Sequence, residues 1–105
     1  MSYRIVYQPR AINEYEEATA WYKERSVQAA ENFDAAVNSK IDFLRVHPLR
    51  YKKTYKDFHE IRIQKYPFNI IFLVDEVKMM VIISSLYHHK RNPKKKYRKA
   101  GMNGY

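Results

Sequence analysis

After a short opening segment, the spacing of apolar residues changes between residues 48 and 58. No other feature of the sequence limits the possible folds as much. Before it, apolar residues recur at spacings of three and four, which is typical of amphipathic helices. After it, they alternate or form short uninterrupted runs, which is typical of strands. Because the helices come first and the strands follow, the chain is predicted to be α+β.

Two helices are predicted before the change. The first runs from about Ala11 to Arg25, and Ser26 is placed to cap the second, which Pro48 stops. Such neighbours with a short break form an antiparallel hairpin. The apolar positions of the first helix are Ile12, Tyr15, Ala18, Trp21 and Tyr22, with the acids Glu14, Glu16 and Glu17 near its start. The stripe of the second is Ala30, Phe33, Val37, Ile41 and Leu44.

Four strands are predicted around this hairpin. One opens the chain at Tyr3–Tyr7, and three form an antiparallel meander at Phe58–Gln64, Phe68–Val74 and Lys78–Tyr87. Residues 49–57 lack a period and are predicted to be a loop. The hairpin is expected to pack on one face of an antiparallel sheet, within a single domain at 1–98, followed by a frayed tail at 99–105.

Composition narrows the class of protein. A chain of 105 residues is long enough for one domain with one core. It has no cysteine, no apolar run near 18 residues and no signal-peptide pattern, so a cytoplasmic protein is expected. No His, Asp or Glu cluster has metal spacing, and no glycine-rich phosphate loop is present, so no metal or cofactor is expected.

The net charge of +9 is unevenly distributed. Residues 1–48 carry six Lys and Arg against seven Asp and Glu, whereas residues 49–105 carry fourteen against four. A lopsided basic chain favours an anionic partner, either nucleic acid or an acidic protein segment. Anionic lipid fits less well, because no helix pairs a basic face with a large apolar one.

Four residues have the chemistry for metal-free RNA cleavage. Histidine serves as acid or base near neutral pH, and arginine matches phosphate oxygens. Adjacent strand residues point to opposite faces, so both histidines cannot enter one site and their alternative role is to end a strand. Arg62 alternates with core isoleucines, and its alternative is a surface pair with Glu60. The candidates are Arg62, His88, His89 and Arg91.

A second group has the chemistry to bind nucleic acid, since cations follow phosphates and aromatic rings stack on bases. For the residues near position 53 the alternative is a solvated loop whose tyrosines, Tyr51 and Tyr55, are half-buried. For those after position 93 it is a solubilising tail. The candidates are Lys52, Lys53, Lys56, Lys94, Lys95, Lys96, Tyr97 and Arg98.

The chain resembles the RelE/ParE superfamily, the toxins of bacterial type II toxin–antitoxin pairs, over roughly residues 3–98. The order and spacing of several short motifs carry this resemblance. They are Ala11-x3-Tyr15-x2-Ala18-x2-Trp21-Tyr22, His47-Pro48, His59-Glu60-Ile61-Arg62-Ile63, Tyr66-Pro67-Phe68-x-Ile70-Ile71-Phe72, Tyr87-His88-His89-Lys90-Arg91-Asn92-Pro93 and Tyr97.

The resemblance implies growth inhibition, a role in plasmid stabilization and a cognate antitoxin that blocks the toxin. The C-terminal motif of the chain, with histidines before Arg91-Asn92-Pro93, is closer to that of the ParE-like members, which inhibit DNA gyrase. Gyrase inhibition is therefore the leading hypothesis. The alternative is a RelE-like enzyme that cuts mRNA on the ribosome, with Arg62 and Arg91 on phosphate, His88 or His89 as acid, and Lys52 or Lys53 assisting the base. A non-toxic basic nucleic-acid-binding module is a further alternative.

Overall fold

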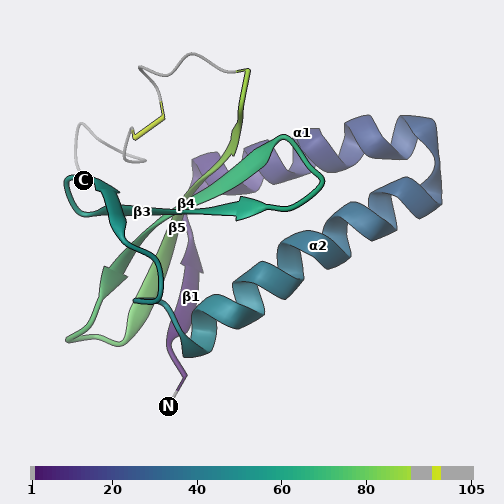
Figure 1. Cartoon of the computed structure of the whole chain (residues 1–105). Coiled ribbons are helices and arrows are strands. Elements are labelled where there is room, and N and C mark those ends of the chain that lie inside the picture. Colours follow the sequence, from purple (N-terminus) through teal and green to yellow (C-terminus); the bar gives the residue numbers. More distant parts are fainter. Residues whose placement is uncertain (1, 91–95, 98–105) are drawn as a thin grey trace.

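The computed structural model describes residues 2–90 and 96–97. It confirms the α+β prediction: an opening strand is followed by two helices and then by a sheet whose one face the helices cover (Figure 1). The elements are β1 (Arg4–Tyr7), α1 (Pro9–Arg25), α2 (Val27–Val46), β2 (Lys53–Tyr55), β3 (Phe58–Ile63), β4 (Phe68–Asp75) and β5 (Met80–His88).

The sheet has the order β1-β5-β4-β3-β2. The predicted meander of β3, β4 and β5 is antiparallel, and β1 joins it at one edge in parallel with β5. The prediction of a loop at 49–57 is wrong at its centre, since β2 pairs there with β3. Three residues are too few to show a period, and the pairing with β3 is what makes them a strand.

Local sequence sets the helix ends. Pro9 occupies the first turn of α1, where its missing N–H costs no hydrogen bond. The Ser26 N–H donates to the Tyr22 carbonyl at the end of α1, and the Ser26 hydroxyl accepts from the Ala29 N–H at 2.9 Å. Ser26 therefore caps α2, as predicted, and is the single residue between the helices. Neither helix is both long enough and apolar enough to cross a membrane among the described residues.

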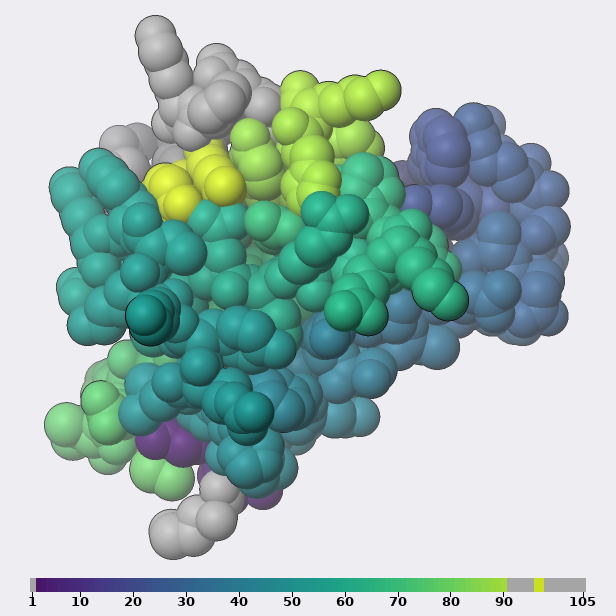
Figure 2. Space-filling view, viewed as in Figure 1, coloured from purple at the N-terminus to yellow at the C-terminus, as the bar shows by residue number. Residues whose placement is uncertain are grey.

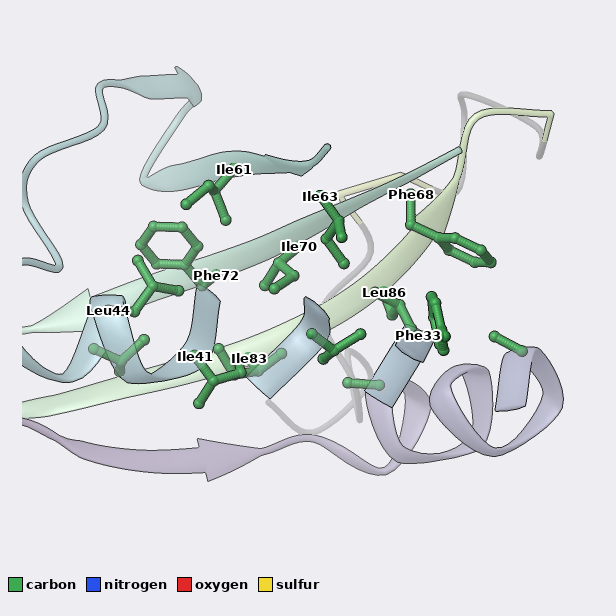
Figure 3. Packing of buried hydrophobic residues seen from close by; sticks show 14 residues of the cluster. Phe33, Ile41, Leu44, Ile61, Ile63, Phe68, Ile70, Phe72, Ile83 and Leu86 are labelled. Atoms are coloured by element: carbon green, nitrogen blue, oxygen red, sulfur yellow. The ribbon is translucent and has the colours of Figure 1, made fainter. Parts of the chain in front are cut away.

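The core lies between the helix pair and the sheet (Figure 3). The predicted stripe of α2 is confirmed, because all five of its residues are buried. They pack on strand residues that include Ile61, Ile63, Ile70 and Phe72, all at most 2% exposed. Burying each such side chain contributes roughly 1.5–3 kcal/mol. The core therefore fixes which face each strand turns outward.

The predicted apolar face of α1 is partly wrong. Ile12 is 44% exposed and Trp21 is 50% exposed, whereas the buried residues are Ala11, Glu14 and Ala18. Alanines let α1 approach the sheet closely, so the helix turns small side chains inward. The larger apolar side chains flank this contact.

Glu14 caps the edge of β5 that β1 leaves unpaired. The pairing of β1 with β5 ends at Ile83, and beyond it the Leu86 N–H donates to Glu14 Oε1 at 3.0 Å. The Ser85 hydroxyl donates to the same oxygen at 2.8 Å, and Arg10 Nε lies 3.3 Å from Oε2. A buried backbone N–H needs an acceptor, and the carboxylate provides it. This contact helps to fix the end of β5, which carries the two histidines.

Candidate functional site on the outer face of the sheet

The site lies on the sheet face turned away from α1 and α2, called here the outer face. Glu60 and Arg62 reach it because they alternate with Ile61 and Ile63, which point into the core. Arg62 is in register with Asn69 on β4, and Asn69 is in register with Tyr87 on β5. Arg62 and Asn69 thus lie side by side on this face, next to the buried Tyr87.

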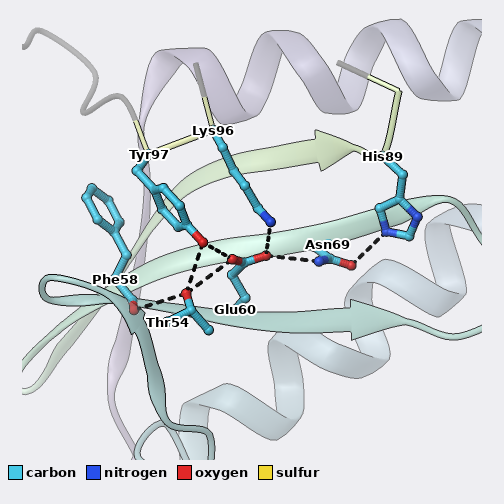
Figure 4. Close-up of polar contacts among 7 residues, drawn as sticks. All are labelled: Thr54, Phe58, Glu60, Asn69, His89, Lys96 and Tyr97. Carbon is cyan, nitrogen blue, oxygen red and sulfur yellow. Dashed lines mark hydrogen bonds and ion pairs between the residues drawn. The ribbon is translucent and has the colours of Figure 1, made fainter. Parts of the chain in front are cut away.

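Glu60 is the centre of a hydrogen-bond network (Figure 4). Asn69 Nδ2 donates to Glu60 Oε2 at 2.9 Å, and Lys96 Nζ lies 3.0 Å from the same oxygen. The Tyr97 hydroxyl donates to Oε1, and the Thr54 hydroxyl lies 3.1 Å from it. Four donors from three parts of the chain, β2, β4 and residues 96–97, therefore converge on one carboxylate.

This network sets the charges of its members. Burial acts to raise the pKa of Glu60, but the bonds from Tyr97, Asn69 and Lys96 outweigh it and hold that pKa below its usual value. Burial acts to lower the pKa of Lys96, yet Glu60 raises it above its usual value. Burial and the bond to Glu60 both raise the pKa of Tyr97. At neutral pH the network therefore consists of a carboxylate, an ammonium and a protonated phenol.

The two histidines separate onto opposite faces, as alternation requires. His89 is exposed, and its Nε2 lies 2.9 Å from Asn69 Oδ1 on the outer face. His88 lies on the helix side, where its ring meets Phe68 edge-on, and its Nδ1 accepts from the Lys90 N–H at 3.0 Å. The outer face thus contains one imidazole, linked through Asn69 to Glu60.

Arg62 is exposed and makes no hydrogen bond or ion pair with any residue that the structure describes. The surface pair with Glu60 does not form, because Glu60 is already occupied by other donors. Binding of an anion by its guanidinium stays a prediction.

The 96–97 pair is seated on the outer face beside β2 and β3 (Figure 2, yellow against teal). The Tyr97 ring stacks on Tyr55 with centroids 4.7 Å apart and contacts Phe58 at 5.5 Å. Beneath it lies a small apolar cluster of Phe58, Ile71 and Tyr87. Lys96 and Tyr97 thus lie on the outer face with their polar atoms bound to Glu60, and their binding of nucleic acid stays a prediction.

The lysines near β2 lie apart from this network. Lys52 is exposed, Lys53 Nζ pairs with Asp57 at 3.3 Å, and Lys56 Nζ lies 5.3 Å from the ring centre of Tyr55. Tyr51 packs edge-on against Phe43 of α2 and does not line an outer groove. The remaining candidates, Arg91, Lys94, Lys95 and Arg98, lie outside the described residues, as does the predicted tail at 99–105.

Sequence reasoning missed Asn69, although a signal was present. It is the one polar residue in the run Phe68–Val74, and a polar side chain in an otherwise apolar strand indicates a specific partner. Because Asn69 was missed, the link that it makes between Glu60 and a histidine was missed as well. Among residues 2–90 and 96–97, no group of three His, Asp or Glu side chains has the arrangement of a metal site.

Comparison with known proteins gives a family and a fold. A family profile described as the ParE toxin of the type II toxin–antitoxin system parDE matches residues 3–93. No match to a curated protein was found.

Several solved structures share the fold. One is the RelBE2 toxin–antitoxin complex of Mycobacterium tuberculosis, with a TM-score of 0.63 and 15% identity over 84% of this chain and 99% of that one. Another is a mutant of E. coli RelE in the free state, with a TM-score of 0.64 and 15% identity over 100% of both chains. Isolated E. coli RelE gives a TM-score of 0.57 and 14% identity over 90% of this chain and 93% of that one.

Proposed function

This chain belongs to the ParE toxin family of type II toxin–antitoxin systems, and we propose that it nevertheless cuts mRNA on the ribosome, as the RelE-like members of the superfamily do. A cognate antitoxin restrains it in this proposal, in keeping with the toxin–antitoxin complexes whose toxins share its fold. RelE-like and ParE-like toxins share one architecture, so the chemistry of the outer face must decide between their targets.

The observation that carries the proposal is the link from Glu60 through Asn69 to His89, beside Arg62. Metal-free RNA cleavage needs a group that exchanges protons near neutral pH and a fixed cation for the phosphate. His89 and Arg62 supply these two functions on one face of a rigid sheet. A protein that only blocks gyrase has no need of an oriented imidazole.

In the proposed reaction, the ribose 2′-oxygen attacks the adjacent phosphorus and gives its proton to a solvent water. The bond between phosphorus and the 5′-oxygen breaks, leaving a 2′,3′-cyclic phosphate. The imidazolium of His89 gives a proton to the departing 5′-oxygen, which becomes a hydroxyl. The Arg62 guanidinium binds the phosphate oxygens and stabilises the charge that develops on them.

The opposite placement of the two histidines gives a matched test. His89→Ala is expected to lower ribosome-dependent mRNA cleavage by about 10² or more, which is the usual contribution of general acid catalysis. His88→Ala, on the helix side, is expected to retain most of the cleavage once corrected for any change in melting temperature. Equal losses in both variants, or full cleavage by His89→Ala, would contradict the assignment.

The second candidate is inhibition of DNA gyrase, which the match to the ParE profile over residues 3–93 favours. In that case the outer face is a docking surface for a protein, and charge there matters more than proton transfer. His89→Gln, which keeps a polar side chain but cannot exchange protons near neutral pH, then arrests growth as the wild type does. Loss of arrest in this variant excludes simple docking.

A further inference from the structure

We infer that Asn69 is a positioning residue that makes Nδ1 of His89 the nitrogen that exchanges protons with the substrate. This inference deepens the proposed function and rests on it only for the role of that proton. The assignment of the nitrogen itself follows from the hydrogen bonds of the outer face.

The first step is the charge of Glu60. Its pKa is held below the usual value, so at neutral pH both oxygens only accept hydrogen bonds. The Asn69 side chain faces Glu60 at 2.9 Å and must turn its NH₂ group toward the carboxylate. The orientation of the amide is therefore determined by its partner.

The second step follows from the shape of the amide. With Nδ2 on Glu60, Asn69 presents Oδ1 to His89, and that oxygen has no hydrogen to donate. His89 Nε2 lies 2.9 Å from Oδ1, so Nε2 must carry the proton of this bond. In the neutral imidazole Nδ1 is then the free acceptor, and in the imidazolium the labile proton is on Nδ1.

The third step is the rigidity of this arrangement. Asn69 lies in β4 between Arg62 of β3 and Tyr87 of β5, and the His89 N–H donates to the Pro67 carbonyl at 2.9 Å. Backbone pairing thus continues to the histidine itself. The backbone of His89 is held by this bond and its ring by Asn69, so one ring nitrogen of the exposed side chain is bonded and the other is left for a substrate.

The other three histidines are internal references for a test. His59 Nδ1 lies 2.8 Å from the Tyr51 carbonyl, which only accepts, so His59 must be protonated at Nδ1. His88 Nδ1 accepts a backbone N–H, so His88 must be protonated at Nε2. His47 makes no ring hydrogen bond among the described residues and reports an unlocked imidazole.

The experiment is NMR of the whole chain with ¹⁵N-labelled histidine at a pH where the imidazoles are neutral, with signals assigned from single His→Gln variants. In the wild type, His89 is expected to show a protonated Nε2 and an unprotonated Nδ1, like His88 and opposite to His59. In Asn69→Leu, the His89 signals should move to the averaged values of His47, while His59 and His88 stay unchanged.

A wild-type His89 that is averaged or protonated at Nδ1 would overturn the inference, and this result needs no variant. Glu60→Gln gives a second route if Asn69→Leu does not fold: a glutamine at 60 both donates and accepts, so Asn69 is no longer forced and the His89 signals should shift toward those of His47. Unchanged His89 signals in a folded variant would also contradict the inference.

Cleavage is measured separately. Asn69→Leu is expected to cut programmed mRNA about tenfold more slowly, as a fraction of what general acid catalysis contributes. A wild-type chain that cuts no mRNA would refute the proposed function, while the NMR assignment of His89 would stand. Normal cleavage by Asn69→Leu with averaged His89 signals would refute the positioning role alone.

Discussion

Two charged residues on the outer face of β3, Glu60 and Arg62, differ in their hydrogen-bond partners. Glu60 accepts from Asn69, Lys96, Tyr97 and Thr54, whereas Arg62 has no partner among the described residues. A carboxylate with four donors has a structural role. An exposed guanidinium in the middle of a strand is available to bind an anion.

Substituting Arg62 tests that availability. Arg62→Ala is expected to change the free energy of unfolding by no more than about 0.5 kcal/mol, because the side chain is exposed and no hydrogen bond or ion pair with a described residue is lost. It should lower mRNA cleavage by about 10- to 100-fold, the equivalent of one charge-assisted hydrogen bond to phosphate. Lys78→Ala, which removes the same charge from the exposed β4–β5 turn, is the control. Equal cleavage by the two variants would exclude phosphate binding by Arg62.

Protonation of Glu60 in acid tests whether its carboxylate holds residues 96–97 on the outer face. Since the pKa of Glu60 is lower in the folded chain than its usual 4.5, its contribution is present above that value and is lost as the pH falls through the folded pKa. Tyr97 should therefore leave Tyr55 and Phe58 in acid, which the NMR shifts of its ring would report. In Glu60→Gln this acid transition should be absent, and an unchanged transition would assign it to another group.

Among the elements, the contact between α1 and β5 helps to position the end of β5 and the histidines there. Glu14 takes the Leu86 N–H and the Ser85 hydroxyl at the point where β1 no longer covers β5. His88 and His89 follow only a few residues later. A side chain on the first helix therefore supports the strand end that presents the imidazole.

Removing this support should affect stability first. Glu14→Ala leaves the buried Leu86 N–H without its acceptor and should lower the free energy of unfolding by about 1–3 kcal/mol in urea titration. Glu16→Ala, on the exposed side of the same helix, should change it little. Similar values for both variants would show that water or another group replaces the carboxylate.

The sequence predicts these elements to different degrees, for physical reasons. The α2 stripe is regular because every member packs on the sheet, so its period alone identifies the buried face. On α1 the same reasoning places Ile12 and Trp21 inside, because a period of apolar residues does not reveal a buried carboxylate such as Glu14. The Asn69 bridge joins residues of β3 and β4 and the residue after β5, so it depends on strand register, which the sequence does not specify.

In the whole molecule, the segment with β1 and the two helices is nearly neutral, whereas the segment with β2 to β5 is strongly basic. The residues up to 48, which form β1 and the helix pair, have one more acid than base, and the remaining residues have ten more bases than acids. Strands β3 and β4 of this basic part carry Glu60, Arg62 and Asn69, and His89 follows the end of β5. We expect binding to an RNA target to weaken steeply with salt, since released counterions drive such association.

The most direct test of the account is a paired assay of the purified chain. One arm follows mRNA on programmed ribosomes, and the other follows gyrase supercoiling of plasmid DNA. We predict cut mRNA with 2′,3′-cyclic phosphate ends, normal supercoiling, and slower cutting by both Arg62→Ala and His89→Ala. Intact mRNA with blocked supercoiling would contradict it and make the outer face a surface for docking on gyrase.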